Sequence, residues 1–351
     1  MKLTIEPIPS SKRILFASGG TAIVWPLFNV ENEATPCELF PDIEQIRDTH
    51  WLSSLPEHFK RSVILNPLLI LLDKSVRNEA FQQNPHTELH KIVAELRGTG
   101  FDFPERYVDK TIRLVMNNMA IWRYQYGMLF PFISIAKALL SPDFSVVQSQ
   151  NVFRKIIDAD IPRFTSILAL IALGILLKRD ATVCDEKLTS ALTQVQHFFR
   201  FTPNKSPYSG HVMMGEWLDR AIPLQTWLLV PMLAGMGYRF VGVPAVATTS
   251  QILHQVVFRA FASTIAAPGE PCQANLAFDI TAFGGELMAD VYAMMTQTRI
   301  RPKPDAAIVR QRLKTLCDIA ASLSHDPLEK KAMRIAWEEW IEPGAGHLLQ
   351  L

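Results

Sequence analysis

The sequence predicts an all-α fold. Most segments after residue 40 carry apolar side chains at helical spacing, and glycines and prolines lie where these segments would end or begin. The segment 164–178 is apolar on every face, which is typical of a helix that is buried on all sides. With 351 residues and 48% hydrophobic types, the chain can bury a large core.

A short two-stranded piece precedes the predicted helices. Arg13–Phe16 and Ala22–Trp25 are the strand candidates, with Gly19-Gly20 between them. We expect loops over residues 201–215 and 267–283, which are rich in Pro, Gly and polar types. Helices are predicted over residues 52–76 (with Pro67 kinking or starting a segment), 86–97, 107–126, 130–140, 144–157, 164–178, 185–200, 223–236, 248–266, 286–298, 304–323 and 328–340.

The charge balance and the hydropathy exclude two classes of partner. The chain has 35 basic and 34 acidic residues, whereas nucleic-acid-binding proteins usually carry a basic excess. Residues 1–13 lack the apolar stretch of a secretory signal. Residues 164–177 are shorter than the roughly 20 that a bilayer requires, and residues 221–238 are interrupted by prolines and glycines. We therefore expect no nucleic-acid partner and no membrane partner.

Few motifs in the chain suggest metal or hydrolytic chemistry. The four cysteines lie far apart without a CxxC pair, so no zinc site or disulfide framework is indicated, and a reducing cytoplasm is expected. His86 and His90 stand at i and i+4, and a metal-dependent enzyme built on them is one alternative. Without a third ligand nearby, surface histidines are the better interpretation. No GxSxG, P-loop or GxGxxG motif occurs.

His254 is the most informative single residue. It lies in the apolar segment ILHQVVFRAFA, where a histidine must find a partner or stay neutral. A satisfied core histidine is one interpretation, and the local sequence alone favours it. The other is a haem iron ligand, which requires a neutral imidazole in an apolar cavity.

The order of several segments resembles the indoleamine 2,3-dioxygenase superfamily of haem enzymes between Trp51 and Arg301. His254 with Val257 resembles the family's proximal-histidine helix, and Gly284-Gly285 resembles its glycine-rich loop. The other segments that carry the resemblance are Leu55-Pro56 through Val76, Pro131–Leu139 followed by Pro142, the helix at Phe164, Pro207-Tyr208-Ser209-Gly210, Gln225-Thr226, and Ala266-Ala267-Pro268.

This resemblance implies a two-domain helical haem protein. Residues 1–145 would form a small, mostly helical domain and residues 146–351 a large domain that binds haem b, with His254 as the iron ligand. Family members oxidise tryptophan or related indoles with O₂, and one branch rearranges chlorotryptophan. The resemblance thus implies a haem-dependent oxygenase that acts with O₂ on an indole, tryptophan-like or other aromatic amino-acid-derived small molecule, in a specialised pathway.

The resemblance also implies a set of site residues. Thr165 or Ser166 would donate a hydrogen bond to bound oxygen or substrate, and Lys205 and Arg220 would hold a carboxylate. The remaining substrate-binding positions are Val146, Ser149, Gln150, Arg163, Phe164, Gly284 and Gly285. This pocket is more polar than one built for tryptophan, so the substrate and the reaction stay open. A non-catalytic, all-helical binding or interaction protein without a cofactor is the alternative.

Overall fold

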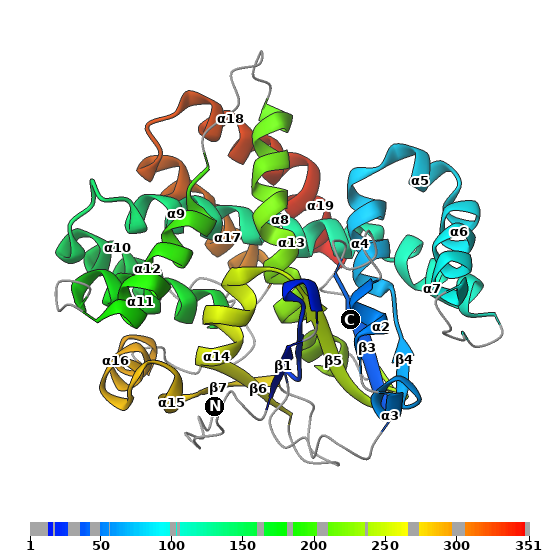
Figure 1. Cartoon of the computed structure of the whole chain (residues 1–351). Helices are drawn as coiled ribbons and strands as arrows, with labels where there is room; N and C mark the ends of the chain where they lie inside the picture. The colour runs from blue at the N-terminus through cyan, green and yellow to red at the C-terminus, as the bar shows by residue number, and fades with distance from the viewer. Residues whose placement is uncertain are drawn as a thin grey trace.

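The computed structural model of the chain is mostly helical but also contains a five-stranded mixed sheet and a two-stranded sheet (Figure 1). The prediction of a helix-rich chain is confirmed, whereas the stricter all-α class is wrong. The structure describes residues 13–16, 18–26, 36–42, 50–55, 57–98, 103, 106–159, 165–180, 185–201, 210–235, 238–265, 274–296 and 306–347.

The five-stranded sheet combines strands from distant parts of the chain. Its order is β1-β2-β5-β3-β4, with bounds Ile14–Phe16 for β1, Ala22–Val24 for β2, Cys37–Pro41 for β3, Val63–Leu65 for β4 and Val243–Thr248 for β5. The strands β1 and β2 pair antiparallel, as do β2 and β5, whereas β3 runs parallel to both β4 and β5. The two-stranded piece expected around Gly19-Gly20 is therefore confirmed as β1 and β2.

Three of these strands were not predicted, for a physical reason. Every residue of β3 is buried, and β5 is buried along all but its first residue, so neither strand shows the alternation of a half-exposed strand. The short strand β4 lies inside the predicted helix 52–76, and Pro67 then starts helix α4 (Leu68–Arg77). Because β5 lies between β2 and β3, segments from before and after residue 145 share one sheet. The domain boundary at residue 145 stays a prediction.

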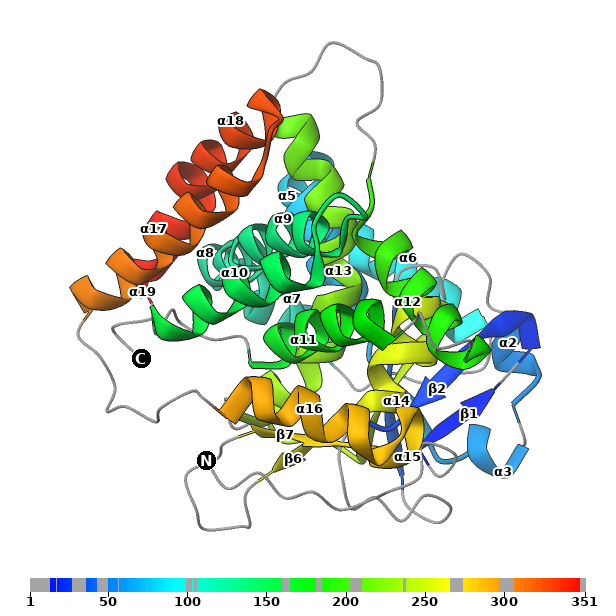
Figure 2. The same ribbon diagram turned by 90° about the vertical axis from the view of Figure 1, so that its left-hand side faces the viewer.

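A helical layer surrounds the most buried helix, α11 (Thr165–Asp180). Residues 167–177 of this helix are buried on every side, as the apolar sequence predicts. Figure 2 shows α11 among its neighbours, and it packs against four helices. These are α9 (Leu129–Leu140), α10 (Val146–Asp158), α12 (Glu186–Phe199) and α16 (Gly285–Thr296). At Gly174, an added Cβ would lie 2.8 Å from Leu140 Cδ2, so a larger residue there would require the Leu140 side chain to move.

Helix α13 (Gly210–Gly235) is the longest helix and joins two hydrophobic cores. Its middle contributes Trp217 and Leu224 to a first core around α9 and α11, and its end contributes Leu229 and Leu233 to a second core beside β3 and β4. It starts inside the loop predicted over residues 201–215, and it contains both Pro223 and Pro231. The second core is also covered by α2 (His50–Ser53), α4, α5 (Glu79–Gln83), α6 (Pro85–Gly98) and α7 (Tyr107–Met116).

The helix predicted over residues 248–266 is wrong in its second half. The π-helix η3 (Ile252–Val257) and one turn, α14 (Phe258–Ala260), lead into β6 (Phe261–Ile265). Strand β6 pairs antiparallel with β7 (Ala274–Phe278), inside the predicted loop 267–283. The remaining elements are η2 (Ser18–Gly20), α3 (Glu57–Lys60), α8 (Met119–Gly127), α15 (Ile280–Phe283), α17 (Ala306–Leu323), α18 (Pro327–Ala336), η4 (Trp337–Ile341) and α19 (Glu342–His347).

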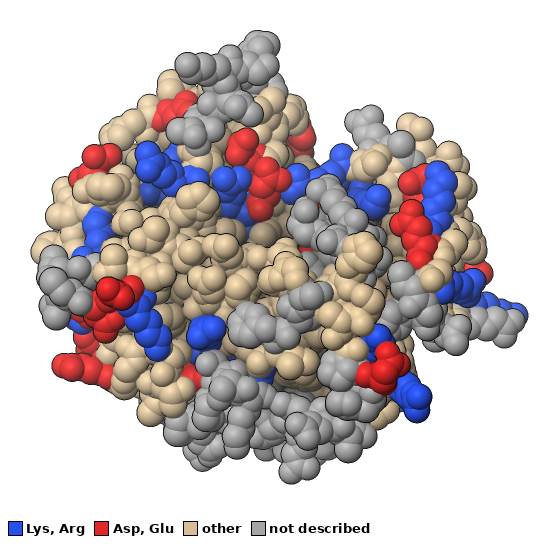
Figure 3. All heavy atoms as spheres, viewed as in Figure 1, with Lys and Arg blue, Asp and Glu red and all other residues tan. Residues whose placement is uncertain are grey.

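The surface shows no dominance of one charge sign on the face in Figure 3, where basic and acidic side chains are interspersed among neutral ones. This pattern agrees with the formal net charge of +1. Within the described part of the chain, no helix has the length and the apolar character to cross a lipid bilayer.

Candidate functional site

His254 lies on an unusual backbone element. The π-helix η3 is a rare geometry that occurs mostly as single turns and frequently at functional sites. The imidazole-bearing residue is only 6% exposed, which agrees with its apolar sequence context. Its backbone N–H donates to the Ser250 carbonyl at 3.1 Å, and this hydrogen bond connects η3 to the residues before it.

The surroundings keep the imidazole neutral. Burial lowers the pKa of His254, the nearby charge of Arg259 lowers it further, and a hydrogen bond with the Thr249 backbone partly opposes both. Arg259 is fixed beside it, because its Nε donates to the His254 carbonyl at 3.1 Å. A neutral histidine has a lone pair that can accept a proton or bind an electron-poor atom.

His254 lines a hollow of about 270 Å³ between η3 and α12, which we call the inner hollow. Its lining residues are Lys187, Ser190, Ala191, Gln194, His254, Gln255, Val256, Arg259 and Phe283. Two of these side chains are cationic, and no Asp or Glu is among the described residues that line it. Lys187 Nζ lies 5.6 Å from the centroid of the Phe283 ring. The inner hollow therefore combines two cationic side chains with the apolar side chains of Ala191, Val256 and Phe283.

A second hollow of about 520 Å³, the outer hollow, continues along α12. Glu186, Thr189, Ser190, Thr193 and Gln194 line it. Because Ser190 and Gln194 line both hollows, the two are parts of one groove, which we call the His254 groove.

A buried ion pair connects the segment after η3 to α15. Arg13 Nη2 donates to the Phe258 carbonyl, just after η3, at 3.0 Å and lies 3.5 Å from Asp279 Oδ2. Asp279 in turn caps α15, since its Oδ1 accepts from the Thr281 backbone N–H at 2.9 Å. The side chains of Arg13 and Asp279 are 4% and 2% exposed. One guanidinium thereby connects the His254 wall to the helix that carries Phe283.

Two residues of the predicted set follow a residue that lines this groove, although neither is in its lining. Gly284 and Gly285 are exposed and follow Phe283 directly, and Gly284 ends α15 with a φ of 89°, where glycine is favoured. Arg163, Phe164 and Lys205 lie outside the described residues. Thr165 and Ser166 begin α11, and Ser166 is half-buried there.

The other predicted residues lie elsewhere. Ser149 Oγ donates to the Leu139 carbonyl at 2.7 Å and so ties α10 to α9. Gln150 lines a separate hollow of about 140 Å³ between α10 and α16, with Met294 opposite it. Val146 is half-buried against the first core. None of these three residues lines the His254 groove.

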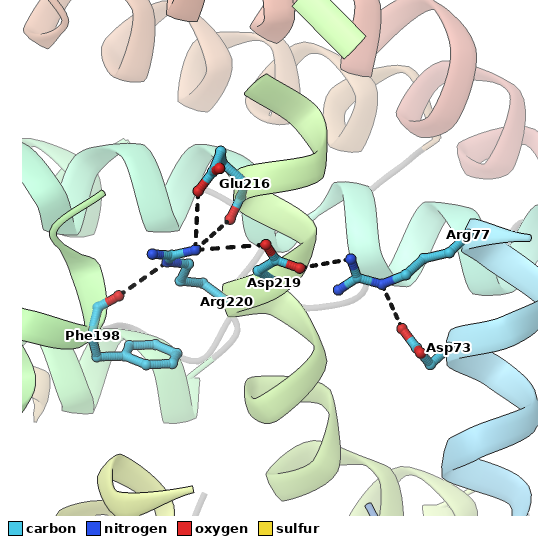
Figure 4. A network of polar contacts seen from close by, with 6 residues as sticks. All are labelled: Asp73, Arg77, Phe198, Glu216, Asp219 and Arg220. Carbon is cyan, nitrogen blue, oxygen red and sulfur yellow. Dashed lines mark hydrogen bonds and ion pairs between the residues drawn. The ribbon is translucent and has the colours of Figure 1, made fainter. Parts of the chain in front are cut away.

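Arg220 belongs to a charged network, shown in Figure 4. Its Nη1 lies 3.2 Å from Glu216 Oε2 and 3.9 Å from Asp219 Oδ2. Its Nε donates to the Phe198 carbonyl at 3.3 Å. Because acidic side chains already compensate its charge, Arg220 as placed here does not offer an unopposed charge to a carboxylate.

The residues around His254 do not fit a haem. A porphyrin requires a broad apolar cavity with walls on both faces, whereas the inner hollow, at about 270 Å³, is smaller than the ~300–1,000 Å³ of ordinary ligand pockets. The residues expected opposite the iron, Ser149 and Gln150, are not in its lining. The buried neutral imidazole is the one feature that suits such a ligand. We therefore derive no step through haem.

Sequence reasoning missed Lys187, Gln194 and Arg259. The first two share a face of α12 with Ser190 and Ala191, at i, i+3, i+4 and i+7, so their helical spacing was a readable signal. Arg259 follows His254 by five residues, and only the wider π-helix turn brings the two together.

No family model, no curated protein and no solved structure matches the chain. The resemblance to the haem superfamily therefore stays a prediction. Across the described residues, no group of three or more His, Cys, Asp or Glu side chains is placed to hold a metal ion. His86, one of the two candidate ligands, has its Nδ1 3.5 Å from Asp109 Oδ1 and is largely exposed.

Proposed function

We propose that the protein is a small-molecule enzyme that binds an anionic substrate in the inner hollow and uses His254 as an acid–base residue. The observation that carries this proposal is the buried, neutral imidazole in a hollow with two cations and, among its described lining residues, no Asp or Glu. Perturbed titratable groups in a concave site are typical of active sites.

Each residue has a stated part in this function. Lys187 and Arg259 attract a carboxylate or phosphate, and Ser190 and Gln194 supply hydrogen bonds. His254 then accepts a proton from an O–H, N–H or C–H group of the bound molecule, because its lowered pKa leaves it unprotonated at neutral pH. Aromatic acids and amino acids fall within this substrate class, since both carry a carboxylate.

A haem-dependent oxygenase is a second candidate, because a buried neutral histidine is the ligand that haem iron requires. The two candidates share His254 but differ in what they need around it. The acid–base enzyme needs the cations of the groove, whereas the oxygenase needs a porphyrin site.

The test of the first candidate is a titration of His254 followed by NMR of its imidazole nitrogens, with and without inorganic phosphate. A phosphate beside Arg259 and Lys187 offsets their charges, so we expect it to raise the pKa of His254 and to shift its signals in a saturable way. Lys187→Met should weaken this response by about fivefold or more.

Lys314→Met is the matched control, because Lys314 is an exposed lysine on α17 outside the groove. It should leave the phosphate response unchanged. Signals of His254 that do not respond to phosphate, or that respond equally in both variants, would refute the proposed anion site.

A further inference from the structure

The outer hollow has a chemistry that differs from that of the inner hollow. Its lining side chains lie on one face of α12, at positions 186, 189, 190, 193 and 194. Three of them carry hydroxyls, one carries an amide and one carries a carboxylate. No apolar or aromatic side chain is among the described residues that line it.

These groups are suited to ligand hydroxyls. The Glu186 carboxylate accepts hydrogen bonds, and the Gln194 amide both donates and accepts. Thr193 Oγ1 already donates to the Thr189 carbonyl at 2.9 Å, so its remaining capacity toward a ligand is as an acceptor. Sugar hydroxyls can donate to such acceptors and accept from the amide and from serine. An aromatic ring would displace the water that hydrogen-bonds to these groups and would offer no hydrogen bonds in its place.

The charges give the groove a direction. Its cations, Lys187 and Arg259, line the inner hollow, whereas Glu186 lines the outer hollow. An anionic group is therefore favoured at the His254 end and disfavoured at the Glu186 end. A molecule that spans the groove should carry its charge at one end and neutral hydroxyls at the other.

We propose that the groove binds a polyhydroxylated anion, a sugar phosphate or sugar acid, with its hydroxyls on the Thr189–Gln194 face of α12 and its charge beside His254. This inference rests on the proposed anion site. It adds a subsite and a substrate class, and it makes Thr193 and Gln194 specificity-determining residues.

The test compares the affinities of five probes: inorganic phosphate, glucose 6-phosphate, ribose 5-phosphate, gluconate and phenyl phosphate. Calorimetry and the His254 NMR signals give the dissociation constants. We expect at least one of the hydroxylated anions to bind about tenfold or more tightly than both inorganic phosphate and phenyl phosphate, since a few added hydrogen bonds supply that ratio.

Variants of α12 test whether its side chains cause the higher affinity for the hydroxylated anion. Thr193→Val should weaken the hydroxylated probe by about three- to tenfold and leave inorganic phosphate unchanged. Gln194→Leu should weaken both probes, and the hydroxylated probe more, because Gln194 lines both hollows. Thr315→Val is the matched control, because Thr315 is also exposed and donates to the carbonyl four residues earlier, at 3.0 Å. Thermal unfolding of each variant checks that the exposed substitutions leave the fold intact.

The outcomes separate the two proposals. If phosphate binds but phenyl phosphate matches or exceeds the hydroxylated probes, the sugar subsite is wrong and the anion site stands. The same holds if Thr193→Val and Gln194→Leu leave the gain unchanged. If no probe shifts His254, both proposals fall.

Discussion

The charged network in Figure 4 and the inner hollow of the His254 groove each contain two cationic side chains, but their charges are balanced differently. In the network, Arg77 and Arg220 face three acids, Asp73, Asp219 and Glu216. In the hollow, Lys187 and Arg259 share the lining with a neutral histidine, and none of the lining residues that the structure describes is acidic. An opposed cation holds a fold together, whereas an unopposed one is available to a ligand.

The network's structural role follows from the elements that it joins. Arg77 Nε lies 2.6 Å from Asp73 Oδ1 on the same helix, α4, and its Nη1 lies 2.6 Å from Asp219 Oδ1 on α13. It thereby links a helix of the second core to the helix that runs through both cores. The guanidinium of Arg220 also lies over the Phe201 ring, 5.4 Å from its centroid, and the Lys137 ammonium lies 4.2 Å from the same centroid.

Removing Arg77 should have the largest effect on the network. Arg77→Met leaves the carboxylate of Asp73, whose side chain is 5% exposed, without its cation. Broken buried pairs cost ~3–5 kcal/mol, and because the Arg77 side chain is itself 34% exposed we expect about 2 kcal/mol of lost stability in urea unfolding.

Arg113→Met on α7 is the control, since Arg113 is exposed. It should change the free energy of unfolding by less than about 0.5 kcal/mol. Equal losses in the two variants would mean that the network does not hold α4 to α13.

Replacing Arg220 should distinguish the charged network from the His254 groove, because it should affect stability and not phosphate binding. Arg220→Met removes ion pairs that are partly open to water, so we expect a loss of about 1 kcal/mol in unfolding free energy. Phosphate affinity in the His254 groove should not change, in contrast to Lys187→Met. A phosphate response that falls as much in Arg220→Met as in Lys187→Met would show that Arg220 serves a ligand.

The pH dependence of stability should have opposite signs in the two regions. Burial raises the pKa of Asp73 despite Arg77, so its charged form is disfavoured and its contribution to stability falls as pH rises above its ordinary pKa of 3.8. Because the pKa of His254 is lowered in the folded chain, the unfolded chain is protonated at a higher pH than the folded chain as pH falls. Its contribution is therefore lost as pH falls below 6.5.

Urea unfolding between pH 4 and 8 tests these signs on Asp73→Asn and His254→Gln. Relative to the unmodified chain, Asp73→Asn should gain stability as pH rises from the acidic end. His254→Gln should gain stability as pH falls through the histidine range. Parallel curves for all three proteins would contradict both assignments.

Local sequence patterns predicted most helices but only two of the five strands of the larger sheet, β1 and β2. Segments such as α11 and α6 carry their own period and end signals, so their existence was readable. Strand β5 depends on partners about 200 residues away in β3, and its burial removes the alternation that marks a strand. Such pairing is decided by tertiary contacts.

For the site, too, the sequence predicted local features and missed those that depend on tertiary contacts. The apolar context of His254 predicted a histidine that finds a partner or stays neutral, and the residue is buried in the structure. The same context also predicted a satisfied core histidine, and the Thr249 backbone supplies a hydrogen bond. What the sequence did not predict is that α12 would pack against η3 and bring Lys187 beside the imidazole. That contact joins residues 67 positions apart and has no local pattern.

Adding haemin should have the smallest effect, because the inner hollow is smaller than an ordinary ligand pocket. We expect the absorption spectrum of protein expressed with a haem precursor, taken ferric, reduced and with CO, to lack a band near 400 nm that depends on His254. His254→Gln is the control for haem bound elsewhere. A band that shifts with CO and disappears in His254→Gln would make the resemblance to the haem superfamily correct. The groove around Lys187 and Arg259 would then require rearrangement on haem binding, and the contrast with the Arg77 network would no longer identify the active site.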